Sequence, residues 1–173
     1  RTLSQTSLMI EKISRKNFIV NSLLVFLIFL LDRLSKIYVV YLDNKFFGSE
    51  IFSSKYLNIS LVWNEGVAFG LLNLEKNHLY NLLTVLIFII IVAIIFMTIN
   101  TQGLRKYSLL MILGGALGNV FDRIFTKAVP DFIDFHVGNF HWFIFNIADV
   151  FISLGVLILI LFEFIGSKEE QKL

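Results

Sequence analysis

An apolar run without a single charged residue occupies positions 79–99 of this 173-residue chain. It matches the roughly 20 residues that an α-helix needs to cross a hydrocarbon core about 30 Å thick. Comparable runs cover 18–41, 107–125 and 146–165, and 57% of the sequence is hydrophobic. A soluble protein would need a polar face on each helix, which these runs lack. We therefore predict a mainly α-helical, polytopic membrane protein with four transmembrane helices.

The residues between the first two runs predict a different kind of structure. The stretch 42–77 is rich in polar residues, and within it residues 56–63 alternate between apolar and polar side chains. That period of two is typical of short strands. Residues 64–66 carry a turn signal, and the apolar residues 67–72 are expected to dip into the membrane interface. We predict one membrane-embedded domain over 1–173, with a small β-structured cradle at 42–77.

The ends of the apolar runs predict the orientation of the chain. A cleavable signal peptide is one interpretation of the N-terminal region, but the first run continues past Asp32 and Lys36 and no small-residue cleavage site follows. We interpret it as a retained helix after a polar lead, 1–17. Basic residues in this lead, in the loop 99–107 and in the C-terminal tail predict that both termini are cytoplasmic. On the outer side, 127–144 is interpreted as a polar and aromatic connection.

Acidic residues interrupt three of the runs at one level. A rise of 1.5 Å per residue places Asp32 about 21 Å from the cytoplasmic end of its helix, Asp122 about 22 Å and Asp149 about 24 Å. An ionisable residue at membrane depth costs at least about 2.5–3.5 kcal/mol on insertion scales, so it marks a functional site by default. Three unrelated interhelical contacts are the alternative. We predict one polar layer in the outer part of the membrane.

Spacings of three or four residues place the polar groups of each helix on one face. These sets are Asp32 with Lys36, Asn119 with Asp122 and Arg123, and Asn146 with Asp149. Gly114 and Gly118 are also four apart, which predicts close approach of a neighbouring helix.

The charges of this layer predict a chemical role. Two cations can neutralise two of the acids, most simply Asp32 and Asp122, in pairs that the sequence does not assign. These cations are Lys36 and Arg123. Asp131 and Asp149 have no obvious cation, and two close carboxylates in a low-dielectric site share a proton and can activate a water molecule. One takes the proton of the water while the other polarises a carbonyl, which is peptide hydrolysis by an aspartic dyad.

Five short motifs carry a resemblance to a known family. They are Asp32-Arg-Leu-Ser-Lys36, Asn64-Glu-Gly-Val-Ala-Phe69, Gly114-Gly-Ala-Leu-Gly-Asn119-Val-Phe-Asp122-Arg123, Val129-Pro-Asp131-Phe and Phe145-Asn-Ile-Ala-Asp149. The chain resembles bacterial lipoprotein signal peptidase, also called signal peptidase II. Each motif alone is a weak signal, but the five in this order are specific, and they cover residues 32–149.

The resemblance implies an aspartic endopeptidase of the bacterial inner membrane, with cytoplasmic termini and an active site near the outer face. The implied substrate is a diacylglyceryl-modified prolipoprotein, cut before its lipid-bearing cysteine. Asp131 and Asp149 are the implied catalytic pair. Implied substrate-positioning or supporting groups are Asn64, Asn119, Arg123 and Asn146, and implied structural residues are Asp32, Lys36, Gly115 and Asp122. A monomer among membrane lipids is expected, with no metal, cofactor or nucleic acid.

Four further polar residues receive other expectations. Asp134 is expected to be a solvated surface residue. The three histidines have no ligand spacing and are expected at the interface rather than on a metal ion. They are His78, His136 and His141.

Two functions of other classes compete with proteolysis. A small transporter or proton relay would also carry intramembrane acids, but here the acids lie in one layer, and the chain shows no duplicated half with interrupted helices. A non-enzymatic assembly protein would have little use for two unpaired carboxylates.

Overall fold

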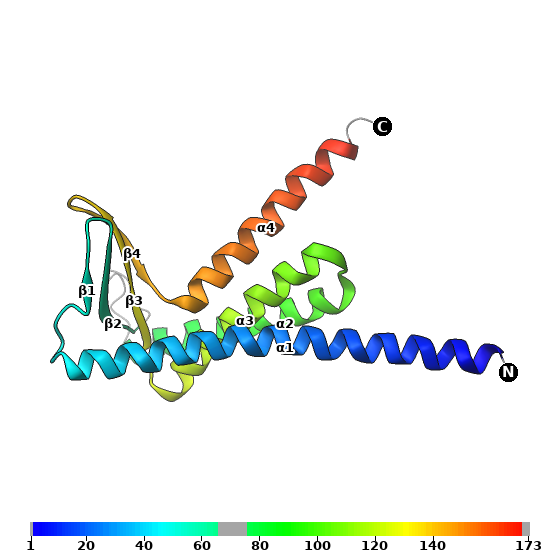
Figure 1. Cartoon of the computed structure of the whole chain (residues 1–173), viewed down its shortest axis with the longest axis horizontal. Coiled ribbons are helices and arrows are strands. Elements are labelled where there is room, and N and C mark those ends of the chain that lie inside the picture. The colour runs from blue at the N-terminus through cyan, green and yellow to red at the C-terminus, as the bar shows by residue number, and fades with distance from the viewer. Residues whose placement is uncertain (1, 66–75, 171–173) are drawn as a thin grey trace.

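The computed structural model describes residues 2–65 and 76–170. Its elements are α1 (Thr2–Lys45), β1 (Phe52–Ser53), β2 (Leu57–Asn64), α2 (Lys76–Asn100), α3 (Gly103–Phe125), β3 (Val129–Val137), β4 (Phe140–Phe145) and α4 (Ile147–Glu170). Figure 1 shows α1 running along the whole molecule, with the sheet beside its C-terminal end. From that end α4 diverges from α1. The polar end of the molecule is thus built by the sheet and the adjoining helix ends.

The central helix is α3, which packs against α1, α2 and α4. Its buried side chains join those of α2 in one apolar cluster. The cluster consists of Ile91, Ile94, Leu109, Ile112, Leu113, Ala116 and Val120. Many other apolar side chains of the helices are exposed, as expected for a surface that lipid covers.

Glycines let α3 approach its neighbours closely. A Cβ at Gly118 would overlap the carboxylate of Asp32, and one at Gly115 would overlap the main-chain carbonyl of Ala148. A Cβ at Gly114 would likewise meet Ile28 of α1. The close approach predicted for Gly114 and Gly118 is confirmed, and it brings α1 and α4 against the polar end of α3.

Three helices are long and apolar enough to cross a membrane. The spans are Tyr80–Asn100, Gly103–Phe125 and Ile147–Phe164, so the chain is a multi-pass membrane protein. The fourth predicted span, in α1, stays a prediction. The helix itself does not begin near residue 18 as expected but includes the polar lead from Thr2, because neither glycine nor proline precedes Gly48 to interrupt it.

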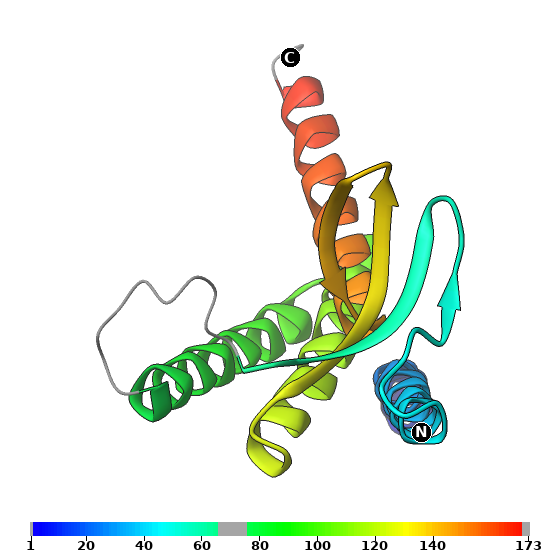
Figure 2. The ribbon, with the colours of Figure 1, turned by 90° about the vertical axis from the view of Figure 1, so that its left-hand side faces the viewer.

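The sheet is larger than predicted. All four strands pair antiparallel in the order β1-β2-β3-β4, and Figure 2 shows them curving beside the end of α1. The alternation at 56–63 is confirmed as β2. The connection predicted at 127–144 contains β3 and β4, which form a hairpin that the sequence analysis did not predict. The last residue of the predicted turn, Gly66, and the apolar segment 67–72 lie outside the described residues.

Candidate active site

Two carboxylates reach the polar end of the molecule from different elements. Asp131 is the third residue of β3, where it pairs with Val62 of β2. Asp149 lies in the first turn of α4. Because β4 leads directly into α4, the sheet fixes the position of the first carboxylate and the start of the helix fixes the second.

Asp131 is almost completely buried and accepts two side-chain hydrogen bonds. The Nδ2 group of Asn64 donates to its Oδ2 atom at 2.9 Å, and Nδ2 of Asn146 donates to its Oδ1 atom at 2.6 Å. Its solvent exposure is 4%. Both contacts are from amides, so this carboxylate is oriented by neutral donors.

Asp149 is held by a reciprocal hydrogen-bond pair at the start of α4. The main-chain N–H of Asp149 donates to Oδ1 of Asn146 at 3.1 Å, and the main-chain N–H of Asn146 donates to Oδ2 of Asp149 at 3.2 Å. This is a capping box, in which the residue before the helix and the third helical residue satisfy each other's free N–H groups. The second oxygen, Oδ1, accepts from Nδ2 of Asn119 at 2.7 Å.

Asn146 is the group that joins the two acids. It is fully buried, its side chain donates to Asp131 and to Oδ1 of Asn119, and its main chain donates to Asp149. We call Asp131 and Asp149 the dyad. The structure thus brings five of the predicted site residues together: the dyad with Asn64, Asn119 and Asn146.

The environment of Asp131 favours its protonated form. Burial raises the pKa of the Asp131 carboxyl, and the hydrogen bonds from Asn64 and Asn146 lower it by less. The negative charge of Asp149 raises the pKa further, as expected when one carboxylate disfavours ionisation of another nearby. This site can therefore hold a proton.

A second polar group lies beside the dyad. We call it the paired cluster, and it consists of Asp32, Arg33, Lys36 and Asp122. Lys36 Nζ contacts Oδ2 of Asp32 at 2.9 Å and Oδ2 of Asp122 at 2.8 Å. The guanidinium of Arg33 binds both oxygens of Asp122, at 2.5 and 2.6 Å, and Oδ2 of Asp32 at 3.1 Å. Two acids and two bases leave the cluster neutral.

Arg33 is the member of the paired cluster that the sequence analysis missed. The prediction considered Arg123 as the second cation for the acids, and this is wrong: Arg123 donates to the main-chain oxygen of Asn119 at 3.2 Å, while Arg33 binds Asp122. Residues three or four positions apart share a helix face and were grouped in the sequence analysis. Arg33 is adjacent to Asp32 in the sequence and was therefore left out of that group. Its presence in the first motif was the available signal, because a long planar guanidinium can reach around the helix to a carboxylate.

The paired cluster forms hydrogen bonds with two neighbours of the dyad, Ala148 and Asn119. Oδ1 of Asp32 accepts from the main-chain N–H of Ala148 at 3.0 Å, which satisfies a free N–H in the first turn of α4. Lys36 Nζ donates to Oδ1 of Asn119 at 2.9 Å, and the amide nitrogen of Asn119 donates to Asp149. The paired cluster therefore positions the helix start and the amide that orient Asp149.

The expectation that Asp134 is a solvated residue is wrong. Its exposure is 6%, and its Oδ2 atom lies 2.8 Å from Nδ1 of His141. The sheet explains the difference, because Asp134 lies in the inner strand β3 between Asn58 of β2 and Ile144 of β4. His136 lies directly opposite His141 in the hairpin, so sequence spacing hid their proximity. The side chain of His78 lies outside the described residues.

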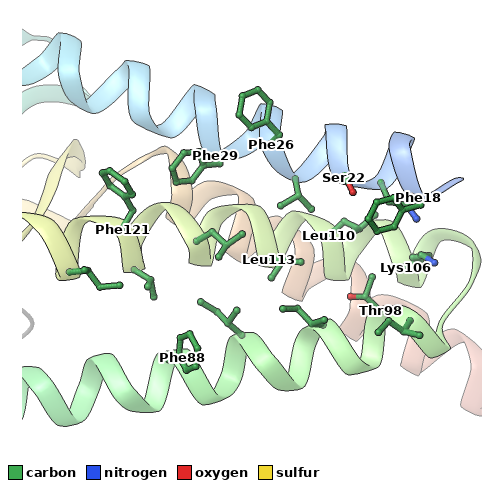
Figure 3. Close-up of a pocket in the computed structure, with 18 of the residues that line it drawn as sticks. Phe18, Ser22, Phe26, Phe29, Phe88, Thr98, Lys106, Leu110, Leu113 and Phe121 are labelled. Carbon is green, nitrogen blue, oxygen red and sulfur yellow. The ribbon is translucent and has the colours of Figure 1, made fainter. Parts of the chain in front are cut away.

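Two apolar pockets lie near the helices. One, of about 840 Å³, is lined by hairpin side chains such as Phe145 and Trp142 and by Asp149 and Val150 of α4, so it opens beside the dyad. The other, of about 720 Å³, lies between α1, α2 and α3. Figure 3 shows its aromatic lining, with Lys106 at one end. Neither acid of the dyad lines this second pocket.

The family match and the relatives found by sequence similarity agree on one family. The family described as Signal peptidase (SPase) II matches residues 24–165. A lipoprotein signal peptidase of Pelagibacter ubique (strain HTCC1062) is 44% identical over 94% of this chain and 98% of its own length. One of Francisella tularensis subsp. novicida (strain U112) is 36% identical over 78% and 88%. A solved bacterial membrane enzyme is 28% identical with a TM-score of 0.67, covering 82% of this chain and 90% of that one.

Proposed function

The chain belongs to the signal peptidase II family, and on that premise we propose that it is an intramembrane aspartic endopeptidase. It removes the signal peptide from diacylglyceryl-modified prolipoproteins by cutting before the lipidated cysteine. The observation that carries this proposal is the convergence of Asp131 and Asp149 on Asn146. Within residues 2–65 and 76–170, neither acid of the dyad forms an ion pair, whereas Asp32 and Asp122 both do.

The dyad supplies one base and one acid for hydrolysis. The ionised carboxylate takes a proton from a water molecule as its oxygen attacks the scissile carbonyl carbon. The protonated carboxyl donates a hydrogen bond to the carbonyl oxygen, and proton transfer gives a tetrahedral diol. The C–N bond then breaks as the leaving nitrogen takes a proton from one carboxyl of the dyad, and a hydroxyl of the diol returns a proton to the other carboxylate. The products are a carboxylic acid and an amine, and the dyad again holds one proton. The raised pKa of Asp131 supports a dyad that holds one shared proton.

The surrounding amides keep the dyad unpaired and oriented. Asn64 and Asn146 hold Asp131, and Asn119 holds Asp149. Because amides carry no charge, they fix the geometry without holding both carboxylates in the ionised form, as a lysine or arginine would. This division suits an acid pair that must exchange protons during each turnover.

An apolar substrate fits the surroundings of the dyad. The pocket that opens beside Asp149 is lined by aromatic and aliphatic side chains of the hairpin and α4. Such walls suit a signal peptide or acyl chain held in the membrane, because both bury apolar surface there. We therefore expect lipidation of the substrate to be required. An unmodified prolipoprotein that is cut as fast as the diacylglyceryl form would contradict this specificity but leave the dyad mechanism intact.

The proposed orientation includes α1 as a fourth span. The charges of its middle part are buried against α3 and α4 through Asp32, Arg33 and Lys36, so they need not face lipid. We place the sheet on the outer side of the bacterial inner membrane and both termini in the cytoplasm. In intact cells, a cysteine at Glu50 should react with a membrane-impermeant thiol reagent and one at Gln102 should not. Equal labelling would contradict the orientation.

The decisive test is cleavage by purified variants. Asp131→Asn and Asp149→Asn nearly preserve shape but remove the ionisable oxygen, so we expect cleavage of a lipidated prolipoprotein to fall by about a hundred- to ten-thousand-fold. The matched control is Glu50→Gln, which removes the same charge from an exposed residue and should cleave normally. A gel-shift assay measures the product. Cleavage by either dyad variant at the control rate would exclude the aspartic mechanism.

A further inference from the structure

Three side chains of the β3–β4 hairpin have no chemical role in the proposed reaction, although His136 is among the residues that line the pocket beside Asp149. We call Asp134, His136 and His141 the hairpin cluster. Asp134 and His136 are two residues apart in β3, so they lie on the same face of that strand. His141 lies opposite His136 in β4. The hairpin therefore gathers one carboxylate and two imidazoles at one place, on strands of the sheet that Figure 1 shows beside the C-terminal end of α1.

The geometry of the hairpin cluster is compact. Nδ1 of His141 lies 2.8 Å from Oδ2 of Asp134, and the rings of His136 and His141 stack with centroids 5.0 Å apart and an interplanar angle of 17°. One possible ligand atom from each of the three residues lies within 4.8 Å of the others. The ligand atoms of a tetrahedral zinc ion with bonds of 2.0–2.1 Å are about 3.4 Å apart. Small side-chain rotations would close the difference.

Two buried atoms of this cluster have no hydrogen-bond partner in the described part of the chain. They are Oδ1 of Asp134 and Nδ1 of His136. Leaving a polar atom buried without a partner costs about 1–3 kcal/mol, and here both atoms are able to ligate a metal ion. Asp134 is also more than nine-tenths buried. A single cation bound between the strands would satisfy both atoms at once.

We propose that the hairpin cluster binds a divalent transition-metal ion of the zinc class. Two imidazoles and one carboxylate form a ligand set that zinc uses, with a fourth position left to water. Magnesium and calcium prefer sites made only of oxygen ligands, so they are poor candidates. His141 has a half-exposed side chain, which gives the ion a route from solvent and leaves this ring free to adjust.

The proposed site is separate from the dyad. Asp131 and Asp134 are three residues apart in β3, so they lie on opposite faces of the strand. A bound ion would join β3 to β4 and stiffen the strand that carries Asp131 without contacting either acid of the dyad. Metal binding therefore does not rest on the proposed proteolysis, and each can fail while the other holds.

Zinc binding to the purified full-length protein tests this proposal. The protein is prepared in detergent micelles without a polyhistidine tag, and equilibrium dialysis against Zn²⁺ should give one ion per chain. Loss of an outer-shell partner alone weakens metal sites about 10–100-fold, so His141→Ala, which removes a ligand, should weaken zinc binding by at least about 100-fold. His136→Ala should do the same. Zinc should also raise the Tm of the unmodified protein but not that of His141→Ala.

Two control variants make the result specific. His78→Ala removes the chain's third histidine and should bind zinc normally. Asp131→Asn should also bind zinc normally, because it lies on the other face of β3. Unchanged zinc affinity in His141→Ala, whose removed side chain is half-exposed and is not needed for the core, would overturn the proposal. Equal weakening by His78→Ala, or displacement of zinc by an equal concentration of Mg²⁺, would also overturn it.

Discussion

The paired cluster and the dyad lie side by side, but the carboxylates of the first form ion pairs and those of the second accept hydrogen bonds from neutral groups. In the paired cluster, Asp32 and Asp122 share Arg33 and Lys36, with every contact at 3.1 Å or less. In the dyad, the donors that the described residues offer to the two acids are amide and main-chain groups. A nearby cation favours the ionised form of a carboxylate, and the resulting ion pair links neighbouring helices. Burial among neutral donors favours the protonated form instead, so such a carboxyl can give up and take back a proton during a reaction. The difference predicts which substitutions affect folding and which affect chemistry.

Removing a cation from the paired cluster should have the largest effect on stability. Lys36→Met leaves two buried acids with one guanidinium, and breaking a buried ion pair costs about 3–5 kcal/mol. We expect a large loss of folded protein, measured by thermal unfolding in micelles, and a loss of cleavage in the same proportion. The control is Lys45→Met, at an exposed position at the end of α1. A Lys36→Met protein with normal stability would contradict the claim that the ion pairs of the paired cluster stabilise the fold.

A conservative change of the other cation should have a smaller effect. Arg33→Lys keeps the charge but loses the bidentate contact with Asp122, and a hydrogen bond to a charged group contributes about 1.5–3 kcal/mol. The free energy of unfolding should fall by that amount. Arg105→Lys is the matched control, because its pair with Glu163 is exposed and 3.6 Å long, and such pairs contribute little. Equal effects of the two substitutions would contradict the assignment of Arg33.

Changing a neutral donor should shift the pH dependence of cleavage instead. Asn64→Leu removes a hydrogen bond that favours the ionised form of Asp131, so the pKa of Asp131 rises further. The proton is then lost at higher pH, so the alkaline limit of cleavage should move to higher pH. Asn44→Leu, at an exposed position, should leave the profile unchanged. A shift of the limit to lower pH would contradict the role of Asn64 as a donor that favours the ionised form of Asp131.

The smallest effect on stability should come from the dyad itself. Asp131→Asn removes a carboxyl group whose charged form burial disfavours, and it loses one hydrogen bond of about 1 kcal/mol. We expect the free energy of unfolding of this variant to lie within about 1 kcal/mol of that of the unmodified protein, despite the large loss of cleavage. Thermal unfolding of the same preparations measures this. A destabilisation as large as that of Lys36→Met would mean that the two regions do not differ in kind.

The helices and the clustering of polar groups could be predicted from the sequence because both follow from local rules. Length and apolarity identified 79–99, and the rise per residue placed Asp32, Asp122 and Asp149 at one level, where the structure brings their surroundings into contact. The alternation at 56–63 likewise predicted β2. Each of these signals lies within one segment, so no knowledge of tertiary contacts was needed.

The errors concern contacts across segments. The hairpin at 129–145 was missed because β3 has acids on both faces and β4 is aromatic on both, which removes the alternation that indicates a strand. Because the hairpin was not predicted, Asp134 was expected to be a surface residue, and His136 and His141 were not expected to be neighbours. Arg33 was missed because helix-face spacing ignores how far a guanidinium can reach. Pairing between strands and between helices depends on tertiary structure, which periodicity does not encode.

The contact between Asp32 and the start of α4 has a consequence for biosynthesis. Asp32 belongs to α1, and its carboxylate accepts a hydrogen bond from the main-chain N–H of Ala148 in α4, which the ribosome produces 116 residues later. A nascent chain can therefore contain α1, α2 and α3 while it still lacks both Asp149 and the helix start that orients it. The pair of carboxylates is completed only when α4 docks on α1, so on the proposed mechanism a chain that has not yet reached α4 has no complete dyad with which to cut a peptide.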